Sequence, residues 1–166
     1  MDTSDTDNET GPSNVLAFGD AVDLLIEKLP ESGHHLFIKL HSLHHPLLGR
    51  SDFVEALKNK LVGSKRYLCH ILLEEIRPGK RNIEFVKYYQ RLTDYIEIRR
   101  FKADYADADR RQYVILDNDL VIWQSYEKRH DMRKFTDLHR VEDFTTAFER
   151  AWKTSERDLS LTKLYI

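Results

Sequence analysis

The sequence has little of several features that mark particular protein classes. Cys69 is the single cysteine, which excludes an intrachain disulfide and fits a reducing cytoplasm. No stretch approaches the roughly 18 apolar residues that a membrane-spanning helix needs. The N-terminus lacks the basic start and the apolar segment of a secretory signal. We therefore expect a cytoplasmic protein with no membrane span, in which Cys69 lies buried and unreactive within the apolar run RYLCHILL.

Familiar catalytic motifs are missing as well. The sequence contains no Gly-rich phosphate loop and no G-x-S-x-G nucleophile turn. No two carboxylates stand at a spacing that indicates acid–base catalysis. These observations predict that the chain carries no cofactor.

Charge is unevenly distributed along the chain. The net charge of the 166 residues is -2, but residues 1–14 hold four acids and no Lys or Arg. The rest is therefore slightly basic, too nearly neutral to indicate nucleic-acid binding by charge alone. We predict a disordered acidic tail over residues 1–15 and one domain over residues 16–166.

Hydrophobic periodicity predicts the secondary structure. We expect helices over 18–29, 52–62, 83–92 and 141–155, and strands over 34–40, 65–73, 95–101, 110–117 and 119–125. Ser51 and Asn82 are the expected N-caps of the second and third helices. The alternation of helix and strand predicts parallel pairing with helices on both faces of the sheet, and the last two strands form an antiparallel hairpin. The fold class is therefore a single mixed-sheet α/β domain flanked by helices.

The long segments between and after these elements are less informative. Residues 126–140 read as a charged loop, and the final helix carries an apolar stripe that we expect to face the sheet through Phe144, Phe148 and Trp152. Lys and Arg residues recur after residue 76 with tyrosines between them, as in a surface on which nucleic-acid bases stack. Acids are interspersed among them, which favours a solvated charged face.

A cluster of histidines is the first candidate site. Imidazole is a common metal ligand, and five of the eight histidines fall within 12 residues: His34, His35, His41, His44 and His45. No cysteine or carboxylate lies within the cluster, and Pro46 argues against a helix there. We therefore predict histidines that cap the loop or face solvent, and no metal.

The hairpin sequence RRQYVILDNDLVIWQS, residues 110–125, carries a family resemblance. Phospholipase D-like enzymes have H-x-K-x4-D on a hairpin, followed by Gly-Ser and an Asn. This stretch resembles that pattern with Asp117 at the aspartate, Gln112 at the lysine and Arg110 at the histidine. Ser125 then matches the serine and Glu127 the asparagine. The resemblance spans residues 20–155. Within the superfamily, the chain resembles in particular a small group of uncharacterised bacterial phospholipase D-like domains that lack the signature.

The resemblance implies one half of a phospholipase D-like fold without its catalytic residues. The guanidinium of Arg110 stays protonated and cannot attack phosphorus as a histidine does, and Gln112 lacks the charge of the lysine. We therefore expect no catalytic residue in the hairpin. The candidate anion site that remains comprises Arg110, Gln112, Asp117, Ser125 and Glu127.

The sequence leaves three functions open. The first is a non-enzymatic module that binds a partner protein or a phosphate-bearing ligand. The second is a nuclease or phosphodiesterase with rearranged residues, drawing on His130, His139 or the histidine cluster. The third is a nucleic-acid-binding accessory protein. Because the family builds a complete site from two facing halves, the resemblance also implies a homodimer with Arg110, Gln112 and Ser125 near the twofold axis.

Overall fold

One mixed sheet runs through the residues that the structure, a computed structural model, describes: 14–76, 83–102, 111–125 and 131–161. Its strand order is β1-β7-β6-β5-β2-β3-β4-β8. The strands are β1 Val15–Ala17, β2 His35–Ser42, β3 Leu68–Glu75, β4 Ile96–Arg100, β5 Arg111–Leu116, β6 Leu120–Ser125, β7 Asp131–Phe135 and β8 Glu156–Arg157. The helices are α2 Phe18–Lys28, the 3-10 turn η2 Leu29–Glu31, α3 Pro46–Gly49, α4 Ser51–Val62, α5 Ile83–Arg91 and α6 Leu138–Lys153.

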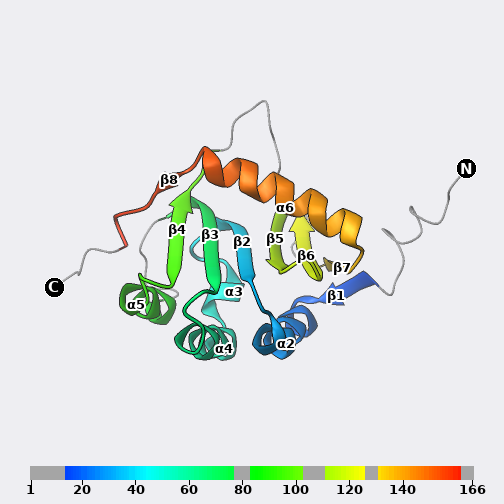
Figure 1. Cartoon of the computed structure of the whole chain (residues 1–166), viewed down its shortest axis with the longest axis horizontal. Helices are drawn as coiled ribbons and strands as arrows, with labels where there is room; N and C mark the ends of the chain where they lie inside the picture. The colour runs from blue at the N-terminus through cyan, green and yellow to red at the C-terminus, as the bar shows by residue number, and fades with distance from the viewer. Residues whose placement is uncertain (1–13, 77–82, 103–110, 126–130, 162–166) are drawn as a thin grey trace, which may run out of the picture.

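The helices cover the two faces unequally. Helices α2, α3, α4 and α5 lie on one face, and among the described residues α6 is the only helix on the other face (Figure 1). Strands β2, β3 and β4 are parallel, whereas β5 is antiparallel to β2 and continues into the β5–β6 hairpin. The predicted fold class and the predicted hairpin are confirmed over the described residues.

Each face has its own apolar core because side chains alternate along the strands. On β2, Leu36 and Ile38 pack towards α2 and α4, whereas Phe37 packs towards α6. Phe144 and Phe148 of α6 are buried against Phe37 and its neighbours, as the sequence predicts. Trp152 is half-buried and stacks on His70 of β3, with ring centroids 4.2 Å apart.

Strand β3 has the central position that its apolar run predicts, but it begins at Leu68. Cys69 is fully buried, and burial raises the pKa of its thiol to about 12. The prediction of a buried thiol is confirmed. No helix among the described residues is long and apolar enough to cross a bilayer.

Strands β1, β7 and the two-residue β8 are not among the predicted strands, and tertiary pairing orders each of them. Strand β7 lies inside the predicted loop 126–140 and pairs with β6 and β1. Its sequence DMRKF is mostly polar, and its buried apolar side chains are Met132 and Phe135. Strand β1 begins at Val15, within the predicted tail 1–15, and is held by β7. Neither strand has an apolar pattern of its own that marks it.

Helix boundaries also shift. Ser51 is not an N-cap but the first residue of α4, where Arg50 takes the N-cap position. Pro46, which the sequence analysis took as evidence against a helix, begins the short helix α3; a first helical residue needs no hydrogen-bonded N–H. Helix α6 begins at Leu138 because the Asp137 carboxylate accepts from the backbone N–H of Arg140. Asn82 lies outside the described residues.

Candidate functional site

The carboxyl ends of the parallel strands meet at one edge of the sheet, here called the carboxyl edge. Strands β2 and β3 end there, and the antiparallel β5 begins there beside the end of β6. In Figure 1 these strands lie side by side between the helices of the two faces. Open α/β sheets bind ligands at such an edge, where strand order reverses. This edge therefore contains the open end of the hairpin and the histidine loop, residues 41–45.

Two buried amides join the hairpin to the histidine loop. The side-chain oxygen Oε1 of Gln112 accepts from the backbone N–H of His41 at 2.9 Å. Gln124 stands opposite Gln112 in the β5–β6 register, and its Oε1 lies 3.5 Å from Nε2 of His45. Both glutamines are buried. The loop and the candidate site residue Gln112 thus converge.

His41 pairs with a carboxylate at this edge. Its Nδ1 lies 2.7 Å from Oε2 of Glu74 on β3, and the two side chains are 43% and 24% exposed. A carboxylate at this distance fixes the orientation of the imidazole and leaves Nε2 as the ring nitrogen that does not face Glu74. Glu74 is not among the site residues predicted from the sequence. The signal was available, because Glu74 ends the apolar run of β3 and parallel strands finish at the same edge.

Two cationic side chains, Lys39 of β2 and Arg111 of β5, come from the adjacent strands of this edge. Lys39 is 3% exposed, its Nζ donates to the carbonyl oxygen of Arg111 at 3.2 Å, and it lies 5.1 Å from the ring centre of Phe101. The guanidinium of Arg111 rests 4.2 Å from the ring centre of Phe144. Cations held against apolar rings have little water around them, so their field reaches further. Sequence analysis did not single out Lys39 or Arg111.

Asp117 lies at the other end of the hairpin. Its carboxylate accepts from the backbone N–H groups of Gly33, His34 and His35 at 2.8–2.9 Å and from the hydroxyl of Ser32 at 3.0 Å. Burial alone would raise the pKa of this carboxyl, but the hydrogen bonds, led by that of His35, lower it below its usual value. Asp117 therefore ties the hairpin turn to the segment that enters β2.

The structure does not bring Asp117 and Gln112 together. They are five residues apart on one extended strand, which corresponds to roughly 16 Å. Ser125 ends β6 opposite Arg111, so its backbone belongs to the carboxyl edge. Arg110 and Glu127 lie outside the described residues, as does His130. His139 lies in the first turn of α6, exposed, with Asp143 at 4.0 Å.

The histidines of the cluster have separate roles. His45 accepts from the backbone N–H of Leu47 and caps α3, and His35 stacks on Phe37 with centroids 4.1 Å apart. Burial lowers the pKa of His35 despite the raising effect of nearby Asp117. Within the described residues, no three His, Cys, Asp or Glu side chains gather into a group that could hold a metal ion.

Comparisons with known proteins place these features in a family and a fold. A family model described as a domain of unknown function (DUF7931) matches residues 19–164. A search of curated proteins finds no match.

Three solved structures are similar. Nuc from Salmonella typhimurium, described as a phospholipase D family member, has a TM-score of 0.61 and 16% identity over 88% of this chain and 97% of its own. NucT from Helicobacter pylori has a TM-score of 0.58 and 14% identity over 87% and 97%. TrmBL2, an archaeal chromatin protein with a novel mode of DNA binding, has a TM-score of 0.54 and 16% identity over 90% of this chain and 56% of its own. At these identities the likeness shows the fold.

Proposed function

Because the chain belongs to the DUF7931 family, a domain of unknown function, we propose a function from its own carboxyl edge: it binds a phosphate-bearing ligand there, without phospholipase D-type catalysis. The observation that carries the proposal is the contact between the histidine loop and the hairpin through Gln112 and His41. That contact assembles a polar edge at the position where folds of this class take their ligands.

The charges of the edge favour an anion. Lys39 and Arg111 supply two cations, and the imidazole of His41 adds a hydrogen-bonding group beside them. Carrying the β2–β5 register two residues beyond the Lys39–Tyr113 pair sets His41 opposite Arg111. Arginine next to a second donor recognises phosphate oxygens well because its fork of N–H groups matches their geometry. We propose that Arg110 and the end of β6 at Ser125 complete this anion site, with Glu127 at its border.

The residues of the hairpin do not support catalysis of the phospholipase D type. Gln112 replaces the lysine of the signature, and its amide is buried and holds the backbone of His41. Arg110 replaces the attacking histidine and offers no lone pair. Asp117, which matches the aspartate of the signature, accepts four hydrogen bonds within the fold. We therefore propose a binding module.

The test is a titration with two fluorescent probes, a short single-stranded oligonucleotide and a polyphosphate. The named neighbours include a phospholipase D family member and a DNA-binding chromatin protein, so both phosphodiesters and free phosphate chains are informative. Arg110→Ala and Arg111→Ala should each weaken binding about tenfold, and added salt should weaken it steeply. Arg150→Ala, an exposed position on α6, is the matched control. Absent or salt-independent binding would leave the protein-partner alternative.

A second candidate function is phosphodiester hydrolysis, which the His41–Glu74 contact favours. With Nδ1 directed at the carboxylate, Nε2 is the nitrogen through which His41 would act on a ligand as a general base or nucleophile. The experiment is hydrolysis of bis(p-nitrophenyl) phosphate by the wild-type chain, His41→Ala and Glu74→Gln. Turnover that both variants lose would favour the enzyme, whereas no turnover by the wild type would favour the binding module.

Assembly into a homodimer is part of the proposal. The phospholipase D-like resemblance implies that two copies face each other across a twofold axis, with Arg110 and Ser125 near it. Gln112 itself is buried within one copy, so it would support this surface from beneath. Light scattering at micromolar concentration should give twice the chain mass of 19.7 kDa. The monomer mass would contradict the proposal.

A further inference from the structure

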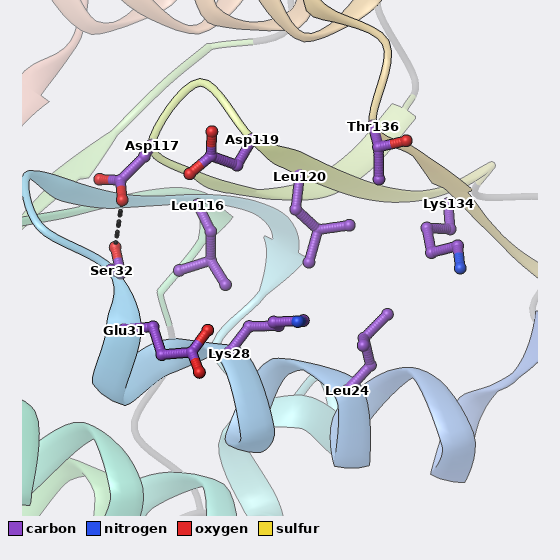
Figure 2. A pocket seen from close by; sticks show the side chains of 10 residues that line it. All are labelled: Leu24, Lys28, Glu31, Ser32, Leu116, Asp117, Asp119, Leu120, Lys134 and Thr136. Carbon is purple, nitrogen blue, oxygen red and sulfur yellow. Dashed lines mark hydrogen bonds between the residues drawn. The ribbon is translucent and has the colours of Figure 1, made fainter.

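A pocket of about 310 Å³ opens at the turn of the β5–β6 hairpin, at the opposite end from the carboxyl edge. It lies between that turn, the end of α2 and strand β7, as Figure 2 shows. The lining residues are Leu24, Lys28, Glu31, Ser32, Leu116, Asp117, Asp119, Leu120, Lys134 and Thr136. Its size falls in the range of small-molecule sites.

The floor of this turn pocket is apolar and rigid. Leu116 and Leu120 are buried, and Leu24 of α2 is half-buried beside them. Asp117 is held by its hydrogen bonds to Ser32 and to the backbone that follows it. Because its oxygens already accept these bonds, Asp117 shapes the wall and has little capacity left for a ligand.

Four other charged side chains line the pocket, two of each sign. They are Lys28 and Lys134, and Glu31 and Asp119. Within the described part of the chain, none of the four side chains takes part in a hydrogen bond or an ion pair. In Figure 2 both carboxylates lie to the left of both ammonium nitrogens. The pocket is therefore an apolar floor with an acidic side and a basic side.

We propose that this turn pocket binds a small zwitterion with an apolar body, of the size of an apolar dipeptide. A purely anionic or cationic ligand would be attracted by one pair of charges and repelled by the other. A zwitterion can place its carboxylate towards Lys28 and Lys134 and its ammonium towards Glu31 and Asp119. Its apolar side chains then cover Leu116 and Leu120, which contributes the hydrophobic part of the affinity.

The experiment uses the full chain and three probes in titration calorimetry. The probes are Leu-Leu, N-acetyl-Leu-Leu, which has lost the ammonium, and Leu-Leu amide, which has lost the carboxylate. Leu-Leu should bind saturably, and each blocked form should bind about tenfold more weakly, as loss of one charge pairing of roughly 1.4 kcal/mol implies. The whole series is repeated with polyphosphate present, which should leave the affinity unchanged because the carboxyl edge is a separate site.

Two variants connect the binding to the pocket. Lys134→Met removes one charge with little change in volume, and Asp119→Asn removes one of opposite sign at an exposed position. Lys134→Met should weaken the binding of Leu-Leu but keep the loss of affinity that N-acetylation causes, because the ammonium is still recognised. Asp119→Asn should also weaken the binding of Leu-Leu but keep the loss of affinity that amidation causes, because the carboxylate is still recognised. Lys153→Met on α6, on the other face of the sheet, is the matched control and should bind as the wild type does.

Several outcomes would overturn the proposal. They are no saturable heat with Leu-Leu at millimolar concentration, blocked peptides that bind as tightly as Leu-Leu does, and unchanged affinity for Leu-Leu in Lys134→Met. Equal affinity for all three probes would show a pocket that selects apolar bodies alone. Since polyphosphate binding is measured separately, failure here is distinguishable from failure of the proposed function.

Discussion

The side-chain oxygen of Gln112 lies 2.9 Å from the backbone nitrogen of His41, across the boundary between β5 and β2. This hydrogen bond satisfies a backbone donor at the edge of the sheet and fixes where the histidine loop leaves it. Gln112 therefore has a structural role in this chain.

Replacing Gln112 with Leu should destabilise the protein. The substitution removes the side-chain oxygen that accepts from the backbone N–H of His41. Loss of this hydrogen bond in a partly buried position costs about 1–3 kcal/mol. Urea unfolding gives the free energy directly. Asn59→Leu, at an exposed position of α4, is the control and should change stability by about 0.5 kcal/mol or less. Equal losses in the two variants would show that the contact contributes nothing.

Asp117 should be more important for folding than its neighbour Asp119. Asp117→Ala removes four hydrogen bonds and puts alanine at a φ of 50°, in the left-handed region, so we expect a loss of about 3 kcal/mol. Asp117→Asn keeps a side chain that tolerates this backbone and should lose less. Asp119→Ala in the same turn is the control for surface position. A loss from Asp119→Ala as large as that from Asp117→Ala would contradict this account.

Helix α6 should depend more on Phe148 than on Trp152. Phe148 is 1% exposed and stacks on Phe37 with centroids 4.6 Å apart, so Phe148→Ala should cost about 3–5 kcal/mol. Trp152 is half-buried, so Trp152→Ala should cost less, about 2–3 kcal/mol. Thermal and urea unfolding measure both. A value below about 1 kcal/mol for Phe148→Ala would contradict the packing of α6 on the sheet.

Stability should fall as the pH is lowered from 7 towards 5. Burial lowers the pKa of His70 and of His35 below the ordinary value of 6.5, although Glu97 and Asp117 oppose the effect. A histidine whose pKa is lower in the folded state binds protons more readily when unfolded, so stability is lost between 6.5 and the lower folded-state pKa.

The check is the free energy of unfolding at several pH values for the wild type and His70→Phe. Phenylalanine can keep the stack on Trp152 without the titration, so this variant should have a shallower decline over that range. An unchanged slope in His70→Phe would show that His70 does not contribute to the pH dependence. Protonation of the Asp117 carboxylate is a separate event at lower pH, because its pKa lies below the ordinary value of 3.8.

Amphipathic pattern was sufficient to predict most of the fold. Phe144 and Phe148 stand at helical spacing, which predicts α6. A near-continuous apolar run predicts β3, and two apolar segments around the turn at Asp117 predict the hairpin. Strands β1 and β7 were missed because they are short and are ordered by pairing: β1 is the edge strand and pairs with β7, which in turn pairs with β6. Their residues carry no comparable period.

The candidate site divides in the same way. The sequence by itself determined that Arg110 cannot attack phosphorus and that Gln112 carries no charge, because side-chain chemistry does not depend on the fold. Only the tertiary structure decided that Gln112 belongs with His41 and Glu74, whereas Asp117 belongs to the other end of the hairpin. The physical reason is that neighbours in a sheet are set by strand order and register, and His41, Glu74 and Gln112 meet from three strands far apart in the chain.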